Sequence, residues 1–189
     1  MQSVLYRLHA IRLLAVACQW KALPLNVSMK TPHQERSATF SEELDLRYLE
    51  LLKAKAPYVQ CKRELLKLEK RWLPRARTPA QRLAIQRIIA NTLLTEAYGS
   101  RMPWKEFGRG LRRLQQLGFA DLGMRVHVSC LYVQALHLFP HKQSREAWDM
   151  LEDTERRVRR LRRESPLREE HLEAIAHAEK VARVPRPRS

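Results

Sequence analysis

The stretch that decides the fold runs from residue 78 to residue 118 and reads TPAQRLAIQRIIANTLLTEAYGSRMPWKEFGRGLRRLQQLG. Residues 78–81 supply a threonine cap, a proline at the first helical position and a glutamine three residues after the cap. Apolar residues then recur with the period of an α-helix as far as Gly99, a natural C-terminal stop. Pro103 opens a second helix, whose apolar stripe ends before Gly118. The stretch therefore predicts two helices joined by a short turn.

The flanking sequence carries the same signals in both directions. Proline closes several expected helices, because it disfavours helical geometry in the residue before it. In the stretch from 120 to 139, apolar residues lie on most sides of the expected helix, and a helix of that kind is normally central and buried. His127 and His137 lie in that stretch, where we expect core histidines bonded to backbone carbonyls. We expect further helices over 39–56, 58–73, 120–139, from a cap at Ser144 to about residue 161, and from Ser165-Pro166 to 182.

This pattern predicts an all-α fold of antiparallel helical hairpins. The expected helices start at a spacing of 42 to 45 residues per hairpin, which is in the range of helical solenoid repeats. Residues 120–163 resemble a tetratricopeptide-type repeat, with Leu136, Glu146-Ala147 and Leu151 placed roughly as in that family. The resemblance implies a solenoid that binds other proteins. A compact helical bundle would give the same periodicities and stays the alternative.

Charge is the strongest compositional signal. The chain has 189 residues, 44% of them hydrophobic, and a formal net charge of +16, with 26 arginines and 10 lysines. Such an excess repels itself unless an acidic partner offsets it, so nucleic acid, an anionic membrane and an acidic protein are the candidate partners. Alternatively, the arginines reflect a GC-rich coding sequence and form a solvated surface.

Cysteine usage indicates a reducing compartment. Cys18, Cys61 and Cys130 are odd in number, far apart and not in CxxC spacing, which argues against a disulfide framework and a zinc site. Free thiols fit a reducing environment, and we expect Cys61 and Cys130 to be small buried hydrophobic residues.

The N-terminal region differs from the remainder, since the first acid is Glu35. Residues 1–28 are interpreted as dispensable or mis-assigned sequence with Met29 as the true start, or as a mitochondrial presequence. We expect a basic, poorly ordered segment over 1–38, one helical domain over 39–182 and a Pro/Arg tail over 183–189. The apolar run is too short for a transmembrane segment. We expect a cytoplasmic protein, or alternatively a matrix protein imported through residues 1–28.

Enzyme-like motifs do not assemble into a site. Glu169, Glu173 and His177 are spaced to share one helical face and could ligate a divalent metal, but no partner helix supplies a matching Glu-x-x-His motif. Gly108 and Gly110 lack the spacing of a phosphate-binding loop. The sequence predicts no enzyme activity, no cofactor and no small-molecule substrate.

Basic clusters are the candidate binding residues. Arginine binds phosphate through two parallel hydrogen bonds, so clustered arginines are typical of nucleic-acid surfaces. Solvated faces paired with nearby acids are the alternative. The candidates for anion or nucleic-acid binding are Lys62, Arg63, Lys67, Lys70, Arg109, Arg112, Arg113, Arg159, Arg160, Arg162 and Arg163.

Two functions follow from this sequence. The first is a non-enzymatic protein-interaction or scaffold module of helical hairpins with a basic surface. The second is a basic RNA- or DNA-associated protein, for example a ribonucleoprotein component. A protein partner is expected under the first hypothesis, and nucleic acid under the second.

Overall fold

The computed structural model describes residues 39–139 and 144–182, which form seven α-helices, a short 3-10 turn and no strand. The all-α prediction is confirmed. The expectations for residues 1–38, including the alternative start at Met29, and for the tail at 183–189 fall outside the described residues. The helices are α2 (Phe40–Lys53), α3 (Tyr58–Trp72), α4 (Pro79–Gly99), α5 (Trp104–Leu117), α6 (Leu122–Ala135), α7 (Ser144–Arg159) and α8 (Pro166–Ala182), with the turn η2 (Leu73–Arg75) after α3.

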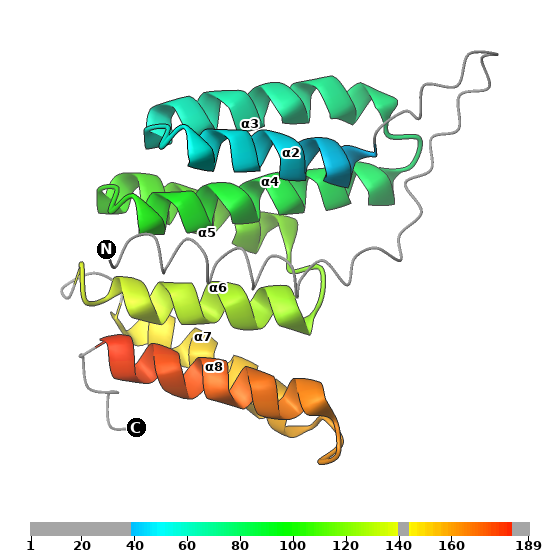
Figure 1. Cartoon of the computed structure of the whole chain (residues 1–189). Helices are drawn as coiled ribbons and strands as arrows, with labels where there is room; N and C mark the ends of the chain where they lie inside the picture. The colour runs from blue at the N-terminus through cyan, green and yellow to red at the C-terminus, as the bar shows by residue number, and fades with distance from the viewer. Residues whose placement is uncertain (1–38, 140–143, 183–189) are drawn as a thin grey trace.

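Consecutive helices pack as adjacent antiparallel pairs, and the pairs stack on one another (Figure 1). Helices α2 and α3 form the first pair and α4 and α5 the second, while α6 contacts α4, α7 and α8. The alternation places the connections 73–78, 118–121 and 160–165 at one end of the stack and the connections 54–57 and 100–103 at the other (Figure 1).

Helix α4 joins the two larger of the three hydrophobic cores in the described residues. Ile85 and Ile89, one turn apart, pack in the core that α2 and α3 form, whereas Ala90 and Leu94 pack in the core of α5 to α8. Every residue from Ile89 to Ala97 is buried. A helix with neighbours on opposite sides cannot show a single apolar stripe, which explains the broad apolar face of its sequence.

Helix α6 is the central helix of the larger core, as its sequence predicts. Its expected end at residue 139 is wrong, because the helix stops at Ala135. The backbone tightens there, with Leu138 N donating to Ala135 O at 3.0 Å. The tighter turn brings the ring of Phe139 edge-on against Trp104, with 5.6 Å between ring centroids.

Two helices end in Schellman motifs, with a basic residue at the left-handed position. At the end of α4, Arg101 has φ 51°, Arg101 N donates to Tyr98 O and Met102 N donates to Ala97 O. Lys55 has φ 51° in the equivalent motif after α2. The expectation that Gly99 stops α4 is therefore wrong in its mechanism: Gly99 is the last helical residue, and the chain turns two residues later.

The helix starts follow the sequence more closely. Capping boxes form at Thr39 with Glu42 and at Thr78 with Gln81. Ser144, expected to cap α7, is instead the first residue of that helix. Cys61 and Cys130 are buried, which confirms the expectation for both, and their thiols donate to the backbone carbonyls of Ala56 and Ala174 at 3.6 Å each.

Candidate functional site

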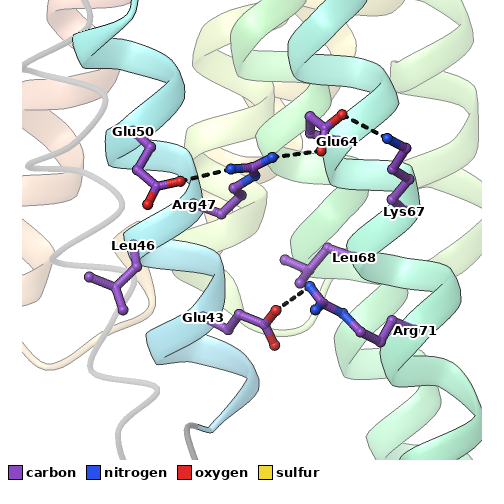
Figure 2. A pocket seen from close by; sticks show the side chains of 8 residues that line it. All are labelled: Glu43, Leu46, Arg47, Glu50, Glu64, Lys67, Leu68 and Arg71. Atoms are coloured by element: carbon purple, nitrogen blue, oxygen red, sulfur yellow. Dashed lines mark hydrogen bonds and ion pairs between the residues drawn. The ribbon is translucent and has the colours of Figure 1, made fainter.

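A surface groove lies between α2 and α3, the hairpin at one end of the stack (Figure 2). Its volume is about 610 Å³. Successive turns of both helices supply the lining side chains, because residues three or four positions apart share a helix face. Six of the eight side chains are charged, and the lining consists of Glu43, Leu46, Arg47, Glu50, Glu64, Lys67, Leu68 and Arg71.

Ion pairs cross this groove from one helix to the other. Arg47 of α2 donates to Glu64 of α3 at 2.8 Å and to Glu50 of its own helix at 2.8 Å (Figure 2). Lys67 reaches the same Glu64 carboxylate at 3.0 Å. Arg71 of α3 pairs with Glu43 of α2. The charges of the groove are thus largely matched to one another.

The pKa values in the groove reflect this pairing. Hydrogen bonds from Arg47, and then from Lys67, lower the pKa of Glu64 to about 2. The same contact with Glu64 raises the pKa of Arg47. Glu64 and Arg47 therefore both keep their charges across the physiological range.

Apolar contacts in the groove are few but exposed. The side chain of Leu46 is 63% exposed at the rim, and Leu68 is buried in the floor. Pockets for small molecules are normally lined mainly by apolar side chains. This groove is instead lined mainly by charged side chains, with one exposed leucine.

The predicted basic residues form three clusters along the chain, at 62–70, 109–113 and 159–163. The structure brings the first two together, but with acids between them. Glu106 of α5 accepts from Lys62 of α3 at 2.7 Å and from Arg109 at 2.7 Å, and Lys62 lowers the pKa of Glu106. Arg113 of α5 pairs with Glu69 of α3, which is buried. Lys62 and Arg113 thus link α3 to α5, while Arg109 pairs within its own helix.

The remaining candidates of these two clusters are more exposed. Arg63 lies 3.4 Å from Glu64, and Lys67 belongs to the groove. Lys70 and Arg112 are exposed and form no ion pair with another described residue. The first two clusters therefore do not form one continuous basic face.

The third cluster lies at the end of α7 and in the connection that follows. Arg159 is paired with Glu155 on the preceding turn at 2.6 Å. The candidates beyond it are exposed and form no ion pair with any described residue: Arg160, Arg162 and Arg163. Of the three clusters, this one keeps the largest unpaired positive charge.

The two histidines expected in the core differ in their surroundings. His127 of α6 lies with its Nε2 atom 3.0 Å from the hydroxyl of Thr95 on α4, and burial lowers its pKa to about 4. The histidine is partly buried against α4, and it bonds a side-chain hydroxyl where a backbone carbonyl was predicted. His137, expected in the same helix core, is exposed. Within residues 39–139 and 144–182, no three His, Cys, Asp or Glu side chains are grouped to hold a metal ion.

Sequence reasoning missed the acids that organise the surface. Glu69 and Glu106 each pair with a cation 44 residues away in the sequence. The only local signal was the spacing of Glu106 and Arg109, three residues apart on one helix. No helix in the part of the chain that the structure describes combines the length and apolarity needed to cross a membrane.

Comparison with known proteins does not assign this chain to a family. No family model matches this chain, and neither a curated protein nor a solved structure matches it.

Proposed function

We propose that this protein is a non-enzymatic interaction module in which stacked helical hairpins, arranged as in tetratricopeptide-type repeats, bind a partner protein. The observation that carries the proposal is the groove between α2 and α3. It combines a strongly exposed leucine with charges of both signs on two facing walls. In helical stacks each hairpin covers its neighbour, and the hairpin at an end leaves a face that another helix can cover.

The expected partner element is an amphipathic helix. The α2 wall carries Glu43, Arg47 and Glu50 at intervals of one turn, and the α3 wall carries Glu64, Lys67 and Arg71 in the same way. A third helix lying along the groove would place an apolar side chain on Leu46 and charges of both signs opposite the walls. This is the arrangement by which flanking charges select partners in coiled coils.

The test is affinity purification of the tagged protein from the native cells after nuclease treatment, with quantitative mass spectrometry. Leu46→Glu puts a charge on the exposed apolar side chain at the rim of the groove and should not unfold the chain, because the side chain is 63% exposed. The matched control is Val59→Glu, which alters a side chain that is 71% exposed in the first turn of α3.

We expect at least one protein to be recovered with the wild type and with Val59→Glu, and to fall at least tenfold with Leu46→Glu. Thermal melts should show that both variants stay folded. Recovery of the same proteins in the same amounts with all three chains would exclude the groove as the binding surface.

A further inference from the structure

The connections at one end of the stack carry an unusual concentration of arginine. The end in question, here called the arginine end, consists of residues 70–82, around the α3–α4 connection, and residues 156–168, around the α7–α8 connection. Residues 70–82 contain five Lys or Arg and no acid, and residues 156–168 contain seven arginines and the single acid Glu164. Antiparallel pairing brings these sequence-distant segments to the same end (Figure 1).

Most of this charge is not neutralised within the described protein. Four of the twelve cations pair with acids: Arg71, Arg156, Arg157 and Arg159. The other eight form no ion pair with a described residue. Seven of these eight are exposed, and Arg168 is half-buried; the full set is Lys70, Arg75, Arg77, Arg82, Arg160, Arg162, Arg163 and Arg168.

Acids near the arginine end do not cancel the excess. Glu42 belongs to the capping box of α2, and Asp121 accepts from the backbone N–H of Met124 and caps α6. Glu169 and Glu170 lie on the first turns of α8, where the helix dipole stabilises negatively charged carboxylates. Four N-termini and three C-termini of the described helices meet at this end, so the dipoles nearly cancel and the side chains set the field.

The chemistry of these side chains favours phosphate over other anions. All but one of the twelve cations are arginines, whose planar guanidinium groups bind a phosphate through two parallel hydrogen bonds. A membrane surface is a poorer fit, because interfacial binding needs an apolar helix face. The exposed large apolar side chain within the two segments is Leu167 alone.

The aromatic residues indicate which form of nucleic acid fits. Proteins that bind single strands stack the bases on exposed aromatic rings. The aromatic residue of the arginine end is Trp72, which is buried. The guanidinium carbon of Arg75 lies over its ring, 5.2 Å from the ring centroid. Contacts to the sugar-phosphate backbone of a duplex need no such ring.

We propose that the arginine end binds the phosphate backbone of double-stranded nucleic acid, without reading its sequence. Helices α4, α6 and α8 contact one another in succession, and packed helices lie about 8–10 Å apart, so the two segments are separated by roughly 20 Å. That distance corresponds to about six base pairs at about 3.4 Å each. The two segments would therefore contact phosphates on either side of one groove.

Fluorescence anisotropy of the full chain with labelled duplexes of about 20 base pairs tests the proposal over about 50 to 200 mM salt. The probes are an RNA duplex, a DNA duplex of the same sequence, the corresponding single strands, and vesicles of phosphatidylcholine with phosphatidylserine. If about six phosphates are contacted, the duplex affinity should fall by about a thousandfold over this range.

Two triple variants remove equal charge from opposite ends of the stack. Arg160→Gln, Arg162→Gln and Arg163→Gln together should weaken duplex binding at least tenfold and reduce the salt slope by about 2.7. Lys53→Gln, Lys105→Gln and Arg145→Gln, at the other end, should change it less than threefold. Glutamine keeps good helix propensity, and circular dichroism should confirm that both variants fold.

The remaining probes decide between sources of the anion. Equal binding of RNA and DNA duplexes supports contact with the backbone alone. The proposal is overturned by equal losses from both triple variants, by no duplex binding at the lowest salt, by tighter binding of single strands or vesicles, or by a preference above tenfold for one duplex.

Discussion

The phenol of Tyr48 on α2 donates a hydrogen bond to the carboxylate of Glu96 on α4, and both side chains are buried. This contact ties the first hairpin to the helix that joins the two cores. A buried carboxylate without its donor loses a charge-assisted hydrogen bond and keeps its desolvation cost.

Tyr48→Phe should therefore lower the free energy of unfolding by about 2 kcal/mol. The substitution removes one hydroxyl and little volume, so a packing defect does not contribute. Urea denaturation at neutral pH measures the change. An unchanged midpoint would show that this hydrogen bond does not stabilise the junction of α2 and α4.

The two Schellman motifs give a prediction in the opposite direction. Lys55 and Arg101 both have φ 51°, a left-handed conformation that costs non-glycine residues about 1–2 kcal/mol. Lys55→Gly and Arg101→Gly should each raise the free energy of unfolding by up to about 1 kcal/mol, after the greater flexibility of glycine in the unfolded chain is deducted. The corresponding alanine variants are the controls and should bring no gain. Stabilisation by alanine as well would point to the lost charge instead of the backbone.

The two cores that meet at α4 should both weaken when side chains of this helix are removed. Ile89 and Leu94 are both fully buried, in the smaller and the larger core respectively. Ile89→Ala and Leu94→Ala should each cost about 2–5 kcal/mol, whereas Leu46→Ala, at an exposed site, should cost less than about 0.5 kcal/mol. Thermal or urea unfolding measures all three. A small cost at either buried site would contradict the role of α4 as the shared wall.

Acid should destabilise the fold through His127. Burial lowers its pKa to about 4, whereas an unfolded histidine has a pKa of about 6.5. The unfolded chain therefore binds more protons between these values, and stability falls as the pH drops from about 6.5 towards 4.

His127→Gln should reduce the loss of stability at low pH, because glutamine can form a hydrogen bond with Thr95 and does not gain a proton. Urea midpoints between pH 7 and about 5.5 measure it, because the stability that paired carboxylates such as Glu64 contribute is lost only below about pH 5. Burial also lowers the pKa of His171. The variant His171→Gln therefore measures how much of the pH dependence of stability comes from that second histidine. Identical pH profiles for the wild type and His127→Gln would contradict the assignment.

Local signals in the sequence predicted the local features of the fold. The cap at Thr78 and the prolines marked most helix boundaries, because these depend on neighbouring residues alone. The left-handed turn at Arg101 was not predicted, since glycine usually fills that position and Gly99 lay close by.

The surface features that the sequence did not predict depend on contacts between residues far apart in the chain. Composition showed a large positive charge, but Lys62 reaches Glu106 only through the register of α3 against α5. The groove at Leu46 likewise depends on how α2 lies on α3. By contrast, the basic cluster at 160–163 was identified from sequence because its arginines are close together in the chain and lie beyond the last turn of α7.

We propose that a partner protein and nucleic acid bind two distinct surfaces of one helical stack, which adjoin at Arg71. The most direct measurement compares Leu46→Glu with the triple variant of Arg160, Arg162 and Arg163 in both binding assays. We predict that Leu46→Glu loses the protein partner and keeps duplex binding, while the arginine variant keeps the nuclease-resistant partner and loses the duplex. Loss of both activities in either folded variant would contradict the separation of the two surfaces.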